Sequence, residues 1–251
     1  MPLSVFLIGI VGGVLSGMLG VGGAVILLPL LTTFAGLSLK EASNITVVQV
    51  VASSLIGWWS FRRGKLVHTQ LALWMGGAGA FGGFAGGYSS AFFTNRDLEW
   101  VFLAVVLAAL ILLFLPVREL TISGDEMPHF SRPYAAGLGL FVGFLAGMLG
   151  AGGGFLIVPL MIAALRVPTK LAIGSSAIVK LISSIFAYGG KVMGMYIDPV
   201  LVLTLLAGAI PFTYLGTWIA RRVSPRTLRT VLGSMLFLIA LRTIQTLFFP
   251  G

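Results

Sequence analysis

The segment Gly17–Leu30 reads GMLGVGGAVILLPL, and the segment Gly147–Leu160, 130 positions later, reads GMLGAGGGFLIVPL. At that offset, residues 9–113 align with residues 139–243 without a gap. Chance apolar similarity would not keep glycine, proline and serine in register over such a length. The chain is therefore a tandem duplication, an organisation that is typical of secondary transporters.

The composition places this duplication in a membrane. The chain has 251 residues, of which 58% are hydrophobic and 9% charged, whereas a soluble domain carries about 25% charged residues. The net charge is +9, and the basic residues lie in short loops between apolar runs, as in membrane proteins. No basic stripe with interleaved aromatic residues is present. We therefore expect the protein to lie in a lipid bilayer and to bind no nucleic acid.

Several chemical functions are not expected from the sequence. There are no cysteines, and His68 and His129 are predicted to lie in loops far apart, so neither a metal nor another cofactor is expected. No nucleotide-binding motif and no intramembrane Ser–His or carboxylate pair is evident, which argues against a primary pump and an enzyme. The N-terminal MPLSVFLIGI lacks the features of a cleaved signal peptide and is interpreted as mature protein.

Each half contains four apolar segments. They cover about 2–35, 42–61, 67–93 and 98–116, and about 134–165, 171–190, 199–220 and 227–249. We expect an N-terminal transmembrane repeat (1–116), a polar linker (117–133) and a C-terminal transmembrane repeat (134–251). The first segment of each half is interrupted by glycines at its midpoint, and each piece is short for crossing a core of about 30 Å.

The loop charges bear on how this first segment is inserted. Arg62, Arg63 and Lys65 follow the second segment of the first half, whereas Arg221 and Arg222 follow the third segment of the second half. We expect the loop after the second segment of the second half, which matches the first basic cluster, to carry only Lys191 and Asp198. Both basic clusters face the cytoplasm only if the first segment enters and leaves on one side.

The sequence therefore predicts an all-α integral membrane protein with two homologous halves. Each half has a re-entrant or hairpin first segment and three transmembrane helices. The halves are expected to be inverted repeats, with a cytoplasmic linker and both chain ends outside. A first segment that spans the membrane fully is the alternative.

The doubled G-x-x-G-x-G-G cluster, followed by an apolar run and a proline, resembles the TauE/SafE sulfite exporter family of membrane transporters. The stretches Ala172–Ser176 and Leu215–Pro225 also look like that family. The resemblance covers essentially the whole chain outside the linker. It implies a multi-pass carrier in the bacterial inner membrane for small sulfur-containing anions, such as sulfite, sulfoacetate or thiosulfate. The equivalent of Ala172–Ser176 in the first half, ASNIT at Ala42–Thr46, departs from the family pattern.

The glycine clusters have a physical reason to hold such an anion. A broken helix leaves free N–H groups at the start of its second piece, where the dipole is positive, and glycine lets an anion approach the backbone. The alternative is that these glycines only form a tight turn or close packing. Predicted substrate contacts at the clusters are Gly20, Gly22, Gly23 and Ala24, and Gly150, Gly152, Gly153 and Gly154.

Polar residues inside the second segment of each half supply further candidates. We predict substrate contacts from Gln49, Ser53, Ser175, Ser176 and Lys180. Lys180 stands deep in an apolar span, where a charge is costly and usually functional. The alternative for Lys180 is that it snorkels or bonds backbone carbonyls.

Other residues are interpreted structurally. Gly9, Gly13 and Gly17, their equivalents in the second half, and Gly79, Gly83 and Gly87 form small-xxx-small ridges for helix packing. Arg242 is expected to snorkel, and the five tryptophans to anchor span ends.

An alternating-access carrier of sulfur oxyanions is the function that the sequence favours. A passive anion channel and a non-transporting membrane scaffold are the alternatives.

Overall fold

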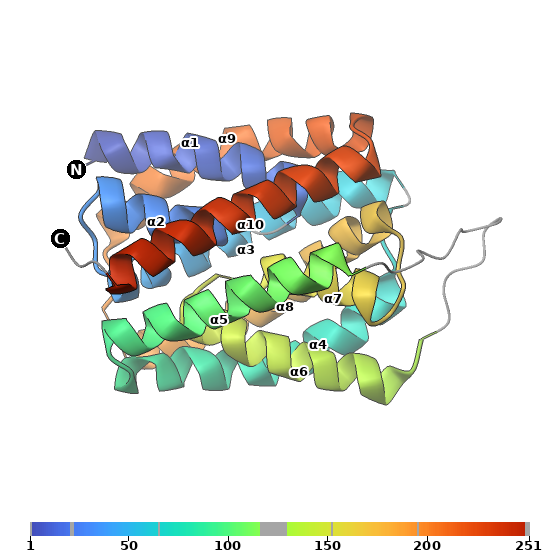
Figure 1. Ribbon diagram of the computed structural model, residues 1–251, viewed down its shortest axis with the longest axis horizontal. Helices are drawn as coiled ribbons and strands as arrows, with labels where there is room; N and C mark the ends of the chain where they lie inside the picture. The colour runs from blue at the N-terminus through green and yellow to red at the C-terminus, as the bar shows by residue number, and fades with distance from the viewer. Residues whose placement is uncertain are drawn as a thin grey trace.

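The computed structural model describes residues 2–20, 23–64, 66–115, 130–151, 153–194 and 196–248. These residues form an all-α bundle, as predicted (Figure 1). In order, its elements are α1 (Pro2–Leu19), α2 (Ala24–Phe34), α3 (Leu39–Arg63), α4 (Thr69–Ser89), the 3-10 helix η1 (Ser90–Phe92), α5 (Asn95–Phe114), α6 (Arg132–Leu149), α7 (Gly154–Ala163), α8 (Thr169–Gly194), α9 (Pro199–Arg222) and α10 (Pro225–Phe248).

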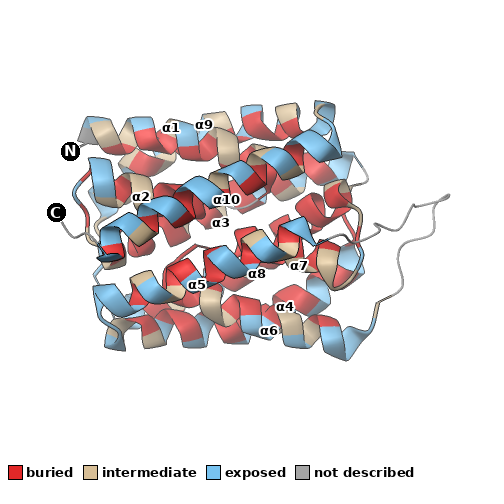
Figure 2. Ribbon diagram, in the orientation of Figure 1, coloured by how far each residue is buried: buried red, intermediate tan, exposed pale blue. Residues whose placement is uncertain are grey.

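Six of the described helices, α3, α5, α6, α8, α9 and α10, are long and apolar enough to cross a membrane. Large apolar side chains such as Phe237 and Leu238 of α10 are exposed, and exposed residues follow the outer face of this helix (Figure 2). Exposed apolar faces of this extent belong against lipid. The chain is thus a multi-pass integral membrane protein.

The first segment of each half is broken into two helices, as the glycine clusters predict. α2 has 11 residues and α7 has 10, so each covers only about half of the bilayer core. In Figure 1, α1 runs from the end of the bundle that holds the N-terminus towards the middle, and α2 returns to that end. Gly20 and Gly23 in the first break, and Gly150 and Gly153 in the second, have φ between 62° and 68°, a conformation that favours glycine.

Equivalent positions in the two halves begin helices with different capping groups. Thr94 caps α5 through its hydroxyl and the carboxylate of Asp97, and its equivalent Ser224 accepts from the backbone N–H of Thr227 at 3.2 Å. His68 Nδ1 accepts from Leu71 N at the start of α4, whereas its equivalent Asp198 accepts from Val200 N and Leu201 N at the start of α9 through a carboxylate oxygen. The repeat has therefore kept the helix starts while the capping chemistry diverged.

The glycine ridges of α1 and α6 pack against helices of the opposite half. Side chains at Gly13 and Gly17 would collide with the carbonyls of Ala209 and Thr213 on α9. Gly143, the equivalent of Gly13, meets Gly79 on α4 in the same way. These contacts confirm the packing role, and they show that α1 pairs with α9 while α6 pairs with α4.

α4 uses a second glycine face to approach α8. Gly83 and Gly87 lie against the carbonyls of Ser183 and Ala187, and a side chain at either glycine would collide with backbone. The equivalents on α9 are Thr213 and Thr217. Glycine at these two positions therefore lets α4 approach the backbone of α8 closely.

The equivalent helices α3 and α8 run in opposite directions (Figure 1). Asn44 near the start of α3 donates to the carbonyl of Tyr196 just after α8. At the other end of the bundle, Arg221 of α9 donates to Ser60 O near the end of α3, and Lys170 at the start of α8 donates to Arg221 O. The start of each helix thus lies at the end of the bundle where the other finishes.

Basic residues gather at one end of the bundle. Arg62 and Arg63 of α3, Arg132 of α6 and Arg222 of α9 lie over the rings of Trp58, Trp59, Trp74 and Trp218, at 3.5–5.9 Å from the ring centroids. The start of α1 and the end of α10 lie at the opposite end of the bundle (Figure 1). Arginine and tryptophan together form an interfacial belt at the basic end.

Candidate functional site

Lys180 of α8 reaches the first break. Its Nζ donates to the carbonyl oxygen of Gly20, which directly follows α1, and Ser176 Oγ donates to the same oxygen at 3.1 Å. Lys180 is 2% exposed and forms no ion pair among the described residues. The ammonium therefore sits at the negative end of the α1 dipole, with two of its three N–H donors free of protein acceptors in the described part of the chain.

The N-terminus of α2 lies in the same break. Gly23 precedes the helix, and no side chain caps it. Ala24 and Val25 are buried, and N–H groups in the first turn of a helix have no intrahelical acceptor. The amide of Gly20 is already used, since it donates to Ser16 O at 3.1 Å. Ile26 N and Leu27 N also donate, both to Gly23 O, at 3.0 and 2.9 Å. The first-turn donors that remain for an anion are thus the amides of Ala24 and Val25.

Gln49 of α3 lies beside this helix start. A Cβ built on Gly23 would be 3.4 Å from Gln49 Nε2 and 2.9 Å from Ser16 Cβ. Gln49 is fully buried, and neither its Nε2 nor its Oε1 has a hydrogen-bond partner among the described residues. An unpaired buried amide costs about 1–3 kcal/mol. Such a group calls for an explanation, and hydrogen bonds from the amide to a bound substrate would provide one.

The second break repeats part of this arrangement with different side chains. Thr46 Oγ1 donates to Gly150 O at 3.2 Å, and Thr46 and Gly150 are the equivalents of Ser176 and Gly20. Gly153 before α7 also has no side-chain cap. A Cβ on it would meet Val142 Cγ1 at 2.8 Å and Ala146 Cβ at 2.9 Å. The start of α7 is therefore surrounded by apolar groups where that of α2 meets Ser16 and Gln49.

Lys191 is not a loop residue, which corrects the expectation from the sequence. α8 continues to Gly194, and the Lys191 side chain is fully buried. Its Nζ lies 2.8 Å from Ser43 Oγ, 3.3 Å from Ser90 Oγ and 3.4 Å from Met148 O in the last turn of α6. Both buried lysines thus come from α8. Lys180 donates to the carbonyl that follows α1, and Lys191 donates to a carbonyl in the last turn of α6.

The remaining residues that were predicted to contact substrate have different surroundings. Ser53 Oγ donates to Val50 O of its own helix at 3.2 Å. Ser175 Oγ accepts from His68 N at 2.8 Å, which holds it at the loop before α4. Gly154 is the first residue of α7 and is buried. Gly22 and Gly152 lie outside the described residues.

Three features of the site could not be predicted fully from the sequence. Ser16 was not singled out, although its equivalent is Ala146, and this difference between the halves could have revealed it. Lys191 was assigned to a loop because it lies near the end of its segment. The sequence marks the equivalent residues Ser54 and Ser184 as polar positions inside a span, but it does not indicate that their hydroxyls are buried without a partner among the described residues.

Comparison with known proteins identifies relatives over almost the full length. The family described as sulfite exporter TauE/SafE matches residues 5–243. The chain is 23% identical to the probable membrane transporter protein YunE of Bacillus subtilis, covering 94% of this chain and 95% of the relative. It is 26% identical to the probable membrane transporter protein YdhB of the same organism, covering 90% and 91%. A probable membrane transporter protein of Xylella fastidiosa is 27% identical, covering 94% and 92%. No solved structure matches.

Proposed function

Because the chain belongs to the sulfite exporter TauE/SafE family of membrane transporters, we propose that it is a secondary transporter of small sulfur-containing anions. Sulfite, sulfoacetate and thiosulfate are the candidate substrates, and alternating access is the mechanism. The relatives are named as probable membrane transporters, which supports the transport of a small molecule. The choice of an anion rests on the chemistry of the first break.

The observation that carries the proposal is the unpaired amide of Gln49 beside an uncapped helix start. Gln49 Nε2, the first N–H groups of α2 and the Lys180 ammonium all offer hydrogen-bond donors to one region. A tetrahedral or pyramidal oxyanion has several acceptor oxygens and a negative charge, so it matches donors and positive potential together. A cation would meet positive potential from both the helix and the lysine.

Alternating access is supported by the relation between the halves. Equivalent helices α3 and α8 run in opposite directions, and the first segment of each half is broken at its glycine cluster, into α1 and α2 and into α6 and α7. Inverted repeats with broken helices near the midplane are a common basis for rocking around a central site. We assign residues 1–116 and 134–251 to the two repeats, and residues 117–133 to a linker that lies mostly outside the described residues.

The orientation follows from the basic end of the bundle. The end that holds Arg62, Arg63, Arg221 and Arg222 is assigned to the cytoplasm by the positive-inside rule. The linker is then cytoplasmic, and both chain ends face outwards. We place the protein in the bacterial inner membrane as a multi-pass carrier.

The test is uptake of labelled sulfite, thiosulfate, sulfoacetate and sulfate into proteoliposomes. Lys180→Met is expected to lower uptake of the preferred anion by about 10- to 100-fold, which corresponds to the loss of a hydrogen bond to a charged group. Lys170→Met is the matched control, since Lys170 lies on the same helix and donates at the surface to Arg221 O. Thermal unfolding confirms that both variants fold.

Two outcomes would contradict the proposal. Equal uptake by the Lys180→Met variant and the wild type would remove the site assignment. Single-channel currents far above carrier turnover in planar bilayers would identify a passive channel instead.

A further inference from the structure

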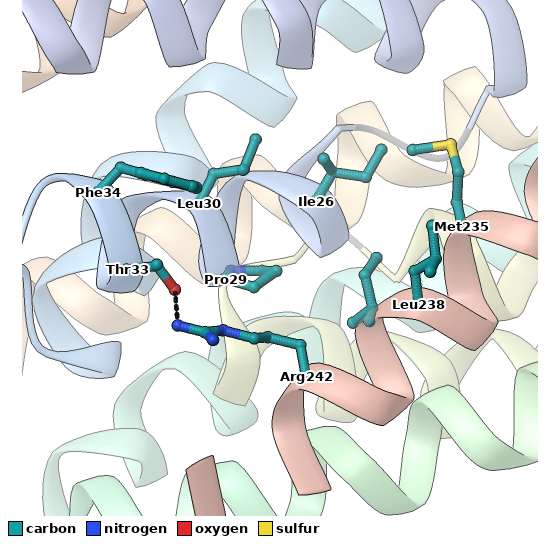
Figure 3. Close-up of a pocket in the computed structure, with 9 residues that line it drawn as sticks. Ile26, Pro29, Leu30, Thr33, Phe34, Met235, Leu238 and Arg242 are labelled. Atoms are coloured by element: carbon teal, nitrogen blue, oxygen red, sulfur yellow. Dashed lines mark hydrogen bonds between the residues drawn. The ribbon is translucent and has the colours of Figure 1, made fainter. Parts of the chain in front are cut away.

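A groove opens on the lipid-facing side of the bundle between α2 and α10 (Figure 3). Its volume is about 400 Å³, and its walls are apolar, with Ile26, Pro29 and Leu30 on one side and Met235 and Leu238 on the other. It lies outside the breaks that form the candidate substrate site. Its shape and walls suit a hydrocarbon chain.

A cation lies at one end of this groove. Arg242 is exposed, and one of its terminal nitrogens donates to Thr33 Oγ1 at 3.1 Å (Figure 3). It stands six positions before the end of α10 at Phe248, which is about 9 Å along the helix axis. That depth is close to the polar boundary of a bilayer, where an arginine can reach headgroups.

The charge of Arg242 is not neutralised in the described part of the chain. Its partner Thr33 is a neutral hydroxyl, and no ion pair joins the guanidinium to a described carboxylate. Glu99 of α5 lines a small neighbouring cavity of about 60 Å³ that Arg242 also lines. Among the groups that line the two cavities, Glu99 is the one carboxylate facing this arginine from a described helix.

The other half contains the equivalent groove without the cation. Between α5 and α7 a cavity of about 420 Å³ is lined by Val105, Ala108, Leu112, Leu156 and Leu160, among others. These residues are the equivalents of Met235, Leu238, Arg242, Ile26 and Leu30. Duplication thus provided two apolar grooves, and one of them carries an arginine at the position where the other has Leu112.

We propose that the groove between α2 and α10 binds an anionic phospholipid. One acyl chain lies along the apolar walls, and the phosphate accepts hydrogen bonds from Arg242 and Thr33. The planar guanidinium has five N–H donors that match phosphate oxygens, and its bond to Thr33 uses one of them. The groove between α5 and α7 offers no such selectivity, because its lining has no cation.

The test is native mass spectrometry of the delipidated full-length protein titrated with phosphatidylglycerol or phosphatidylcholine. We expect the wild type to retain phosphatidylglycerol about tenfold more tightly, and Arg242→Leu to abolish this difference. The reciprocal variant Leu112→Arg is expected to add a second selective site. Arg242→Lys, which keeps the charge, is expected to retain part of the selectivity and serves if Arg242→Leu fails to fold.

The readout is lipid binding alone, so it is independent of any transported substrate. Equal retention of the two lipids by the wild type, or unchanged selectivity in a folded Arg242→Leu variant, would overturn the proposal. Displacement of phosphatidylglycerol by millimolar inorganic phosphate would assign the arginine to a free anion and overturn it as well.

Discussion

Gly23 and Gly153 begin equivalent helices with φ of 68° and 62°, but the side chains around the two helix starts differ. Ser16 and Gln49 adjoin the first, whereas their equivalents are Ala146 and Val179. A lysine of α8 reaches each break. Lys180 has one acceptor among the described residues, whereas Lys191 has several. The backbone of the repeat has thus been retained in both halves. The polar groups at the second break bond one another, whereas those beside the start of α2 include an amide without a partner among the described residues.

Gln49→Val, which copies Val179 into the first half, is expected to have the largest effect on transport. Uptake of the preferred anion should fall about 10- to 100-fold, because the amide contributes donors to the substrate. Stability should rise by about 1–3 kcal/mol, because an unpaired buried amide is removed. Proteoliposome uptake and thermal unfolding measure the two effects, and a stability loss together with normal uptake would give Gln49 a purely structural role.

Substitution of the two glycines with alanine compares the breaks directly. Gly23→Ala and Gly153→Ala should each lose more than the roughly 1–2 kcal/mol that positive φ costs alanine. The added methyl group would also lie 2.7 Å from Gly12 O in the first variant and 2.8 Å from Val142 Cγ1 in the second. Only Gly23→Ala should also weaken the binding of the anion, since its methyl group would enter the space beside Gln49. Calorimetric titration of both variants with the preferred anion tests this, and equal losses of affinity would show that both breaks bind substrate.

Lys191→Met is expected to affect stability and leave substrate affinity unchanged. It removes the donor for Ser43, Ser90 and Met148 O, which should cost about 1–3 kcal/mol. Lys180→Met should show the opposite pattern, with a larger loss of affinity than of stability. Thermal unfolding with and without the anion separates the two lysines, and a loss of anion-induced stabilisation in Lys191→Met would place Lys191 in the binding site.

Ser16→Ala, which copies Ala146, is expected to have the smallest effect. The affinity for the anion should fall about 3- to 10-fold, the usual range for one neutral hydrogen bond. Thr204→Ala is the control, because Thr204 donates to its own helix at the surface. If isothermal titration gives the same affinity for both variants and the wild type, Ser16 does not contact the anion.

Comparing the two halves of the sequence was sufficient to predict the helix breaks and the faces that pack. The spacing of Gly9, Gly13 and Gly17 defines a ridge on one helix face. The spacing does not indicate which helix packs against that ridge. The partner, α9, belongs to the other half. The carbonyls of Gly83 and its equivalent Thr213 meet the equivalent glycines Gly147 and Gly17, so this contact is kept although the residue type differs.

The site was only partly predictable for a similar reason. Gln49 and Lys180 could be selected because polar residues are rare in membrane spans. Whether the Gln49 amide has a partner depends on the neighbours that folding brings to it, and these come from α1 and α2. The burial of Lys191 depends on how far α8 extends, and helix ends are the least certain part of a sequence-based assignment.

The pairing of α1 with α9 has a consequence for synthesis. α1 ends at Leu19 and is synthesised long before α9, the helix that packs against its glycine ridge, which begins at Pro199. At about 5–20 residues per second, the α1–α2 hairpin waits on the order of ten seconds or longer for its partner. During that interval its ridge faces lipid, the translocon or an insertion chaperone, so nascent chains truncated before Pro199 should be the forms that the membrane quality-control proteases remove first.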